Sequence, residues 1–395
     1  MKLLVYSHFF TPSIGGVETM VFSLAQGLAA LRLPDGGKQF DVTVATQTPA
    51  GDFDDRSLGF RVIRLPGLGA LWGLVRASDV VHLAGPALSP LLFCWLARKP
   101  VVVEHHGYQA SCPNGLLLHQ PDRTLCPGHY QAGRYAECLR CQASEISMFR
   151  SWTSLLRMFP RGFLVRRATA NIAVTQYVLE RQALPRSVVI LHGIEDSLSE
   201  EHFSAPSSEG AAKICFGYVG RFVREKGISV LVDAARLLKE EHLEFEVRLI
   251  GDGPERARLE EKIARYELES CVHITGFLTG AALSQTLRDV RVIVMPSIWE
   301  ETAGLAAIEQ MMLGRLVIAS GIGGLGEVVG DAALRCPPGN AGALAQCMRR
   351  VLHEPALIDG YGGKARARAL QLFARGRMIE EHAGVYLEVI RKTRG

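Results

Sequence analysis

The chain has 395 residues, of which 48% are hydrophobic and 21% charged, an ordinary globular balance that excludes a largely disordered protein. A formal net charge of +4 is too small to indicate a nucleic-acid-binding protein, although it allows contact with anionic ligands or an anionic membrane surface. This length favours two domains over a single core. No apolar run reaches the roughly 18 residues that span a bilayer, and the N-terminal run meets His8 and Pro12 without a cleavage site for a signal peptide. We therefore expect a cytoplasmic protein.

Short apolar runs alternate with helical patterns through the first half of the chain. One such pattern, 18–31, has apolar residues at helical spacing. The expected strands of this half are 2–7, 41–46, 60–65, 79–85, 100–107 and 170–175. Runs of about six largely β-branched residues separated by helices predict a parallel sheet that is covered on both faces.

The same alternation returns in the second half. Residues 188–195 lead into a polar, serine-rich segment, 197–213, which is the best candidate for a linker. Beyond it we expect strands at 214–220, 244–253, 271–277, 289–297 and 315–321, and helices at 228–241, 254–266 and near 304–313. The predicted fold class is therefore α/β, with two doubly wound Rossmann-like domains that face a cleft. Ligands of such domains bind at the carboxyl ends of the strands. The expected divisions are 1–200, with a cysteine-rich loop at 108–145, then 210–371, and a final helix within 372–395 that returns to the first domain.

Two cations follow the first strand of the second domain. Arg221 and Lys226 stand beside glycines, which let a ligand approach the backbone. The alternative is a solvated basic turn. At roughly 4 Å and an effective dielectric constant of about 20, each cation attracts a phosphate oxygen by about 4 kcal/mol, enough to hold a diphosphate and to stabilise it as a leaving group.

The stretch "SIWEETAGLAAIEQM" (297–311) adds an expected anion site. A helix that begins near Ala303 or Gly304 directs its first free N–H groups, up to that of Leu305, toward the cleft. Glu301 precedes this helix, and Glu309 lies about a turn and a half into it, where its carboxylate can accept hydrogen bonds from two ribose hydroxyls. The alternative is a hydrated helix start whose glutamates are favoured by the helix dipole.

The first domain offers matching parts. Gly15 and Gly16 form a loop between its first strand and first helix, and His105 and His106 end a strand at the expected mouth of the cleft. A structural role is the alternative for either histidine. "GIGGLG" (321–326) matches the dinucleotide fingerprint G-x-G-x-x-G, but it follows a late strand of its domain, with no acidic strand end about 20 residues further on. We therefore do not expect dinucleotide binding.

The ordered motifs "GGVE", "HHGYQASCPNG", "GYVGRFVREKGI", "LIGDGPE", "ITGFL", "PSIWEETAGLAAIEQMMLGRLVIASGIGGLGEVV" and "CPPGN" resemble those of the retaining glycosyltransferases of family 4, which have the GT-B architecture. The resemblance covers nearly the whole chain, and the E-x7-E spacing of Glu301 and Glu309 is its most specific element. The chain departs from the family pattern at Ala303, where an aromatic residue is usual, at Gln310, and at Glu104 and Gly107. These departures affect the identity of the sugar rather than the type of reaction.

The resemblance implies a role for each candidate residue. Gly15 and Gly16 approach the donor phosphates, and the spacing to "CP" selects His106 over His105 as the contact to the donor sugar. Arg221 and Lys226 grip the diphosphate together with the helix start at Ala303, Gly304 and Leu305. Glu301 faces the sugar as the catalytic carboxylate, and Glu309 holds the ribose.

The resemblance further implies a retaining hexosyltransferase with an N-terminal acceptor domain and a C-terminal domain that binds a UDP- or GDP-sugar. No catalytic metal is expected, since cations and a helix terminus face the diphosphate and no D-x-D tripeptide ends a strand. The expected acceptor is a glycan or a lipid-linked intermediate of cell-surface polysaccharide or glycolipid assembly. The alternatives are a nucleotide-sugar epimerase or hydrolase of the same architecture, and a non-catalytic sugar-nucleotide-binding module.

Two further features stay open at this stage. Cys112, Cys126, Cys138 and Cys141 are either the ligands of a structural zinc ion or free thiols, since disulfides are disfavoured in a cytosolic chain. Residues 146–170 interleave aromatic and leucine side chains with five arginines. They form either a peripheral membrane contact, which would place the protein at the inner face of the membrane, or a helix packed on the first domain with its arginines extended to solvent.

Overall fold

The computed structural model describes residues 1–122, 124–196 and 213–394, and the chain divides into two compact units. Unit 1 comprises Met1–Ile194 and Arg375–Gly395, and unit 2 comprises Glu195–Ala374. The predicted linker, 197–213, lies outside the described residues except for Lys213.

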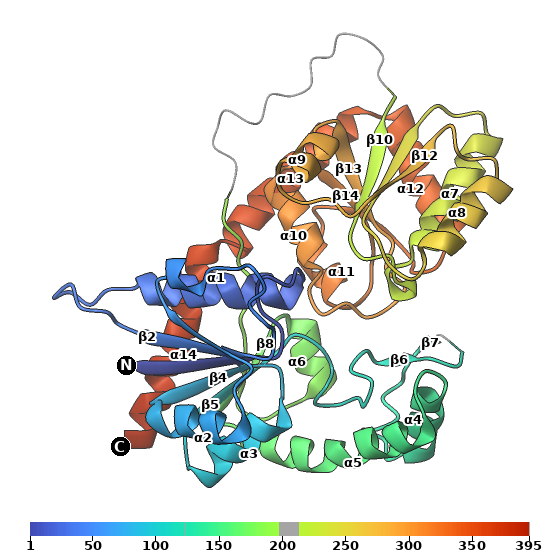
Figure 1. The fold of residues 1–395 in the computed structure, drawn as a ribbon. Helices are drawn as coiled ribbons and strands as arrows, with labels where there is room; N and C mark the ends of the chain where they lie inside the picture. Colours follow the sequence, from blue (N-terminus) through green and yellow to red (C-terminus); the bar gives the residue numbers. More distant parts are fainter. Residues whose placement is uncertain (123, 197–212, 395) are drawn as a thin grey trace. The chain divides into compact units, whose positions relative to one another are not determined.

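Unit 1 is built on a parallel sheet with the strand order β3-β2-β1-β4-β5-β8-β9 (Figure 1). Its strands are β1 (Lys2–Ser7), β2 (Asp41–Thr46), β3 (Arg61–Arg64), β4 (Val80–Ala84), β5 (Val101–His105), β8 (Ala170–Ala173) and β9 (Ser187–Val189). Its helices are α1 (Gly16–Ala30), α2 (Leu68–Ala77), α3 (Leu88–Leu96), α4 (Tyr135–Ala143), α5 (Met148–Val165), α6 (Gln176–Gln182) and α14 (Arg375–Arg394). A two-stranded ribbon, β6 (Leu118–His119) with β7 (Thr124–Leu125), and a 3-10 turn, η1 (Asp55–Ser57), complete it. The central strands are buried on both faces because helices cover each side of the sheet.

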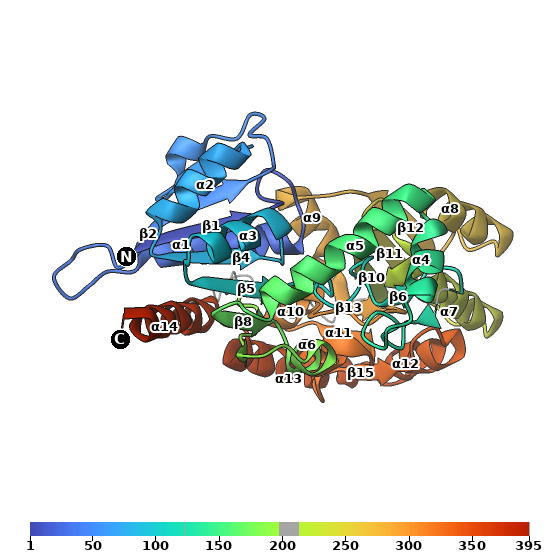
Figure 2. The same ribbon diagram turned by 90° about the horizontal axis from the view of Figure 1, so that it is seen from below.

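The C-terminal helix α14 packs on unit 1, against α1 and β4 (Figures 1 and 2). Gly27 of α1 makes this approach possible, since a Cβ built there would lie 2.0 Å from Cδ1 of Ile379 on α14. Oη of Tyr386 lies 2.9 Å from Nδ1 of His82 on β4. The C-terminal helix α14 is therefore part of the core of unit 1, together with the N-terminal strand β1.

Unit 2 has a parallel sheet with the order β12-β11-β10-β13-β14-β15, in which the first strand, β10, lies beside the fourth, β13. Its strands are β10 (Cys215–Val219), β11 (Glu246–Ile250), β12 (Val272–Gly276), β13 (Val290–Met295), β14 (Leu316–Ser320) and β15 (Leu334–Cys336). Its helices are α7 (Ile228–Glu240), α8 (Arg256–Arg265), α9 (Gly280–Leu287), α10 (Leu305–Met312), α11 (Gly323–Val329), α12 (Ala341–His353) and α13 (Ala356–Leu372), with a 3-10 turn, η3 (Arg224–Lys226). Both sheets reverse their order beside the first strand, so the predicted α/β class with two doubly wound domains is confirmed.

Candidate functional site

The candidate residues of unit 2 gather where its strand order reverses. Arg221 and Lys226 follow β10, and Glu301 follows the neighbouring strand β13. Because the two strands are parallel, their carboxyl ends meet at one edge of the sheet. This is the position at which doubly wound sheets bind ligands.

Lys226 and Glu301 form an ion pair at this edge. Nζ of Lys226 lies 3.0 Å from Oε2 of Glu301, and the two side chains are 21% and 3% exposed. The hydroxyl of Ser297 donates a hydrogen bond to the other carboxylate oxygen, Oε1. Both oxygens of this buried carboxylate therefore have a partner. These interactions offset the free-energy cost of removing the charge from water.

Arg221 belongs to the same neighbourhood through Tyr218. The hydroxyl of Tyr218 donates to the carbonyl oxygen of Arg221 over 3.0 Å. Burial raises the pKa of Tyr218, the charge of Glu301 raises it further, and that of Arg221 opposes the rise. A single buried tyrosine thus lies within electrostatic reach of both the cation and the carboxylate.

Backbone contacts hold the Lys226 turn against the segment that leads to Glu301. The N–H of Ile298 donates to the carbonyl oxygen of Glu225 over 2.9 Å. Gly227 has φ +69, and a Cβ there would lie 2.0 Å from the carbonyl oxygen of Pro296. A glycine is therefore required for the two segments to come this close.

The start of α10 lies beside the carboxylate of Glu301. Gly304 caps the helix in the left-handed conformation, with φ 75, and a Cβ on it would lie 3.5 Å from Oε2 of Glu301. The expected anion-binding N–H groups at Ala303, Gly304 and Leu305 are therefore placed next to the Lys226–Glu301 pair. The first N–H groups of a helix have no acceptor within it and favour a negative charge.

Glu309 is the fifth residue of α10. Burial raises the pKa of its carboxyl group to about 7. Among the described residues no cation pairs with Glu309 to offset its burial, whereas Glu301 has Lys226 as its ionic partner. The carboxyl group of Glu309 is therefore about half protonated near pH 7.

The glycines of "GIGGLG" pack against the backbone of Glu301. Gly324 donates its N–H to the carbonyl oxygen of Glu301 over 2.6 Å. Gly323 has φ +61, and a Cβ there would lie 2.7 Å from the same oxygen. The motif that matched a dinucleotide fingerprint therefore fixes the backbone that carries Glu301.

In unit 1, Gly15 and Gly16 form the entry to α1. Gly15 caps the helix in an extended conformation, and Gly16 is its first residue. A Cβ on Gly15 would lie 2.4 Å from Oε2 of Glu18 in the first helical turn. The carboxylate of Glu18 therefore lies against the backbone of Gly15, and a side chain at this position would displace it.

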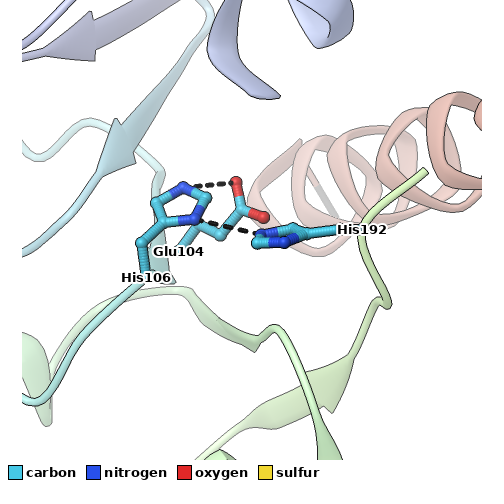
Figure 3. Close-up of side chains that lie close together, drawn as sticks. All are labelled: Glu104, His106 and His192. Atoms are coloured by element: carbon cyan, nitrogen blue, oxygen red, sulfur yellow. Dashed lines mark hydrogen bonds and ion pairs between the residues drawn. The ribbon is translucent and has the colours of Figure 1, made fainter. Parts of the chain in front are cut away.

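His106 lies in a cluster with Glu104 and His192, whose polar atoms face one another (Figure 3). Nε2 of His106 is 3.3 Å from Oε2 of Glu104, and Nδ1 is 3.2 Å from Nε2 of His192. Burial lowers the pKa of His192 to about 3, so this ring is neutral at pH 7. Each of the three offers one atom within 4.8 Å of the others, close enough to share a metal ion. Because these contacts pair the polar atoms with one another, we interpret the cluster as a network that orients His106.

Glu104 extends the network to the C-terminal helix. Nε2 of His82 lies 3.3 Å from its Oε2, and Nε2 of His382 on α14 lies 3.6 Å from its Oε1. Burial opposes ionisation of this carboxyl group, but His106 and His382 outweigh burial and hold its pKa well below the usual range. His105 points elsewhere, with Nε2 2.9 Å from Oδ1 of Asn171, and burial lowers its pKa to about 4.

Replacing Glu104 by glutamine is expected to lower the free energy of unfolding by about 3–5 kcal/mol at pH 7, because buried histidines lose their anion. The lowered pKa means that this stabilisation is present above the usual pKa of 4.5 and is lost as the pH falls through the folded-state value. Urea denaturation of both proteins from pH 7 down to about pH 3, which enters the window below 4.5, measures the difference. The exposed ion-pair variant Glu241→Gln serves as the control and should unfold like the wild type; an equal loss in both variants would contradict the prediction.

Several residues around Glu301 and around His106 were not predicted as functional from the sequence. Ser297, Gly323 and Gly324 contact Glu301, and their proximity in sequence offered a signal. His82, His192, His382 and Tyr386 come from distant parts of the chain and had none. Glu104 was noticed only as a departure from the family pattern.

Comparison with known proteins places the chain among transferases of sugars. Residues 199–368 match the family described as "Glycosyl transferases group 1". The chain is 30% identical to the glycogen synthase of Mycobacterium tuberculosis, over 100% of this chain and 96% of that protein. It is 35% identical to a 2-deoxystreptamine glucosyltransferase of Streptomyces kanamyceticus, over 40% of this chain and 41% of that enzyme, so this match spans about two fifths of that relative. The Anabaena protein HepE, solved in complex with UDP, has the same fold, with a TM-score of 0.71, 19% identity, and coverage of 98% of this chain and 100% of that one.

Proposed function

This chain belongs to the group 1 glycosyltransferases, and we propose that it moves a sugar from a nucleotide diphosphate to an acceptor hydroxyl with retention of configuration. The observation that carries the proposal is the Lys226–Glu301 pair, which stands beside the start of α10 at the switch point of unit 2. This arrangement combines a cation and free N–H groups for a diphosphate with a carboxylate for the sugar.

The donor is a UDP- or GDP-sugar. Arg221, Lys226 and the N–H groups at Ala303, Gly304 and Leu305 hold its diphosphate, whose charge they stabilise as it leaves. Glu309 accepts the ribose hydroxyls, and Glu301 faces the transferred sugar. Gly15 and Gly16 approach the phosphates through their backbone, and His106 contacts the sugar. The HepE structure supports a uracil nucleotide as the first ligand to test, because that neighbour was solved with UDP.

In the transfer step, the oxygen of the acceptor hydroxyl bonds to the anomeric carbon on the face from which the diphosphate departs. The bond from that carbon to the diphosphate oxygen breaks, and the proton of the hydroxyl passes to the leaving diphosphate. Lys226 and the helix start neutralise the charge that develops there, so we propose that no divalent cation is needed. The hexose-bearing product is a glycan or a glycolipid intermediate of the cell surface.

A panel of UDP- and GDP-sugars tests this proposal. One member should raise the unfolding temperature, since a ligand at 100 times its Kd stabilises the folded state by about 2.7 kcal/mol. The best member then enters a transfer assay with saccharide and lipid-linked acceptors, with and without EDTA. An α-linked product from an α-linked donor, formed equally in EDTA, is expected. No stabilisation by any member, or an inverted product, would overturn the proposal.

The raised pKa of Glu309 predicts that UDP binds more tightly as the pH rises. Only the ionised carboxylate accepts both ribose hydroxyls, and burial raises its pKa to about 7. Between pH 6 and pH 8 the affinity should therefore rise about tenfold. Calorimetric titration of the wild type and of Glu309→Gln measures the effect, and the variant removes the part that comes from ionisation of UDP itself.

The raised pKa of Glu309 also determines how the stability of the folded protein changes with pH. Because the folded-state pKa lies above the ordinary 4.5, Glu309 contributes stability below pH 4.5 that is lost as the pH rises through about 7. At pH 8 and without ligand, Glu309→Gln should therefore be more stable than the wild type.

For the binding prediction, equal pH dependence of UDP affinity in the wild type and in Glu309→Gln would refute the proposed contact between Glu309 and the ribose.

We propose that α5 brings the enzyme to an anionic membrane surface. Exposed Phe149, Trp152, Leu156, Phe159 and Phe163 recur at helical spacing and form one stripe along the helix. Arginines at 150, 157, 166 and 167 accompany them, and the guanidinium of Arg167 lies 3.6 Å from the ring centroid of Phe163. In the described chain no helix is both long and apolar enough to cross a bilayer.

Replacing Phe149 and Trp152 together by glutamine is expected to weaken vesicle binding at least 100-fold, since each buried aromatic contributes about 1.5–3 kcal/mol. Co-sedimentation with phosphatidylcholine vesicles, with and without phosphatidylglycerol, measures the binding. Leu370→Gln, a change at an exposed leucine on α13, should bind like the wild type. Unchanged binding of the double variant would leave the alternative, a helix packed on unit 1 with its arginines in water.

A further inference from the structure

Four cysteines of unit 1 surround one small cavity between the β6–β7 ribbon and α4. The cavity has a volume of about 10 Å³ and is lined by Cys112, Cys126, Cys138 and Cys141. Each cysteine is free of disulfides and only 6–7% exposed. A space of about 10–15 Å³ holds a single water-sized particle, so the cavity suits one small ion.

Different segments of unit 1 place these four side chains around the same cavity. Cys138 and Cys141 are three residues apart on α4 and share a face of that helix. The N–H of Cys112 donates to the carbonyl oxygen of Tyr108 over 2.7 Å, and the N–H of Cys126 donates to that of Leu117 over 2.8 Å. Backbone structure thus fixes all four Cα positions before any ion binds.

N–H groups point at two of the sulfurs. Backbone N–H groups of Leu117, Asn114 and Gly115 face Cys112. Sγ of Cys141 accepts from the backbone N–H of Gln120 over 3.3 Å and from Nδ2 of Asn114 over 3.4 Å. Both sulfurs also donate as thiols, Cys112 to Oδ1 of Asn114 over 3.0 Å and Cys141 to the carbonyl oxygen of Leu118 over 3.6 Å. The N–H groups are in place to stabilise the thiolates that metal binding would create.

The remaining electrostatics call for a cation. The four sulfurs line the same small cavity. Four thiolates would therefore repel one another in this cavity. A divalent cation at its centre reverses that repulsion, because metal binding and thiol deprotonation are coupled.

We propose that Cys112, Cys126, Cys138 and Cys141 bind one structural zinc ion as a closed tetrahedral site. Binding forms four Zn–S bonds and releases four protons from the thiols, with no change of oxidation state. His119 lines the same cavity, with Nδ1 2.9 Å from Oδ2 of Asp122 and a buried Nε2 without a hydrogen bond. His129 lines the cavity as well and has a buried Nδ1 without a hydrogen bond. These two histidines are the competing ligands, each in place of one sulfur.

The site fixes the loop that follows His106. Gly107 is already held through its carbonyl oxygen, which accepts from Nε2 of Gln182 over 3.1 Å, and Cys112 lies five residues further on. Any effect of zinc on sugar transfer rests on the role proposed for His106. The presence of the ion does not, so metal content and transfer are measured separately.

Elemental analysis of the full chain, expressed with added zinc and purified without chelators, tests the site. About one zinc ion per chain is expected, and Cys138→Ser and Cys141→Ser should each lose it. Cys347→Ser, at a half-buried cysteine of unit 2, and His119→Gln should both retain it. In the wild type, a mercurial reagent should release the zinc as four thiols react, which gives a readout where a serine variant fails to fold. Purified wild type without stoichiometric zinc, with iron instead, or with two disulfides by mass would overturn the proposal; loss of zinc in His119→Gln would overturn the four-sulfur ligand set.

Discussion

Replacing Glu301 by alanine is expected to lower kcat for sugar transfer by about 10²–10³-fold, as the loss of a charge placed to stabilise a transition state does. Its carboxylate is buried, held by Lys226 on one oxygen and by Ser297 on the other. Its backbone is fixed by Gly324. The negative charge is therefore preorganised, and it faces the sugar in the proposed donor complex.

UDP should still bind to Glu301→Ala, with equal or higher affinity. The variant leaves Lys226 without its internal carboxylate, so the cation becomes fully available to the diphosphate. Calorimetry with UDP and an initial-rate assay with the nucleotide sugar separate binding from turnover. Glu300→Gln, a change at the adjacent buried carboxyl group, is the matched control. Parallel loss of UDP binding and turnover in Glu301→Ala, or near wild-type turnover, would remove Glu301 from the catalytic role.

The central strands of both sheets were predictable because they are buried runs of mainly apolar residues. The expected strand 289–297 contains β13 (Val290–Met295), and 244–253 contains β11 (Glu246–Ile250). The position of the proposed anion site followed from the same reasoning, since parallel strands bring their carboxyl ends to one edge. Gly304 was identifiable as a helix start, and the structure places it as the cap of α10.

The network around Glu104 was beyond such reasoning. Its members come from β4, β5, the segment after β9 and α14, so their pairing depends on the tertiary fold. His82 and His382 are 300 positions apart, and periodicity acts over only a few turns. The cysteine-rich stretch expected as the loop 108–145 also contains a helix, α4. Cys138 and Cys141 lie on it, which a pattern of cysteine spacings alone does not show.

In the proposed mechanism, the Lys226–Glu301 ion pair links donor binding to catalysis. In the free protein the carboxylate occupies the cation, whereas the proposed donor brings a diphosphate that also needs it. Binding therefore exchanges part of an internal ion pair for an external one. The net attraction of Lys226 for the diphosphate must be smaller than the about 4 kcal/mol of an unpaired cation at roughly 4 Å.

Replacing Lys226 by methionine is expected to weaken UDP binding by about 30–150-fold, corresponding to about 2–3 kcal/mol after the loss of the internal pair is subtracted. Methionine keeps most of the length of the side chain and removes its charge, so the effect reports electrostatics rather than packing. Arg224→Met is the matched control, because Arg224 is an exposed cation on the same 3-10 turn. It should bind UDP like the wild type. Lys226→Arg should recover part of the affinity, since the charge returns with a different donor geometry.

A double-mutant cycle of Lys226→Met with Glu301→Gln then separates the two roles of the lysine. Once the carboxylate charge is absent, removal of Lys226 should cost more UDP affinity than it does in the wild type, because the cation no longer serves an internal partner. Calorimetry at two salt concentrations measures all four proteins, and the dependence on salt should be weaker wherever Lys226 is missing. Equal UDP affinity of Lys226→Met and wild type would show that the diphosphate binds elsewhere, and the proposed donor site at the β10–β13 edge would have to be abandoned.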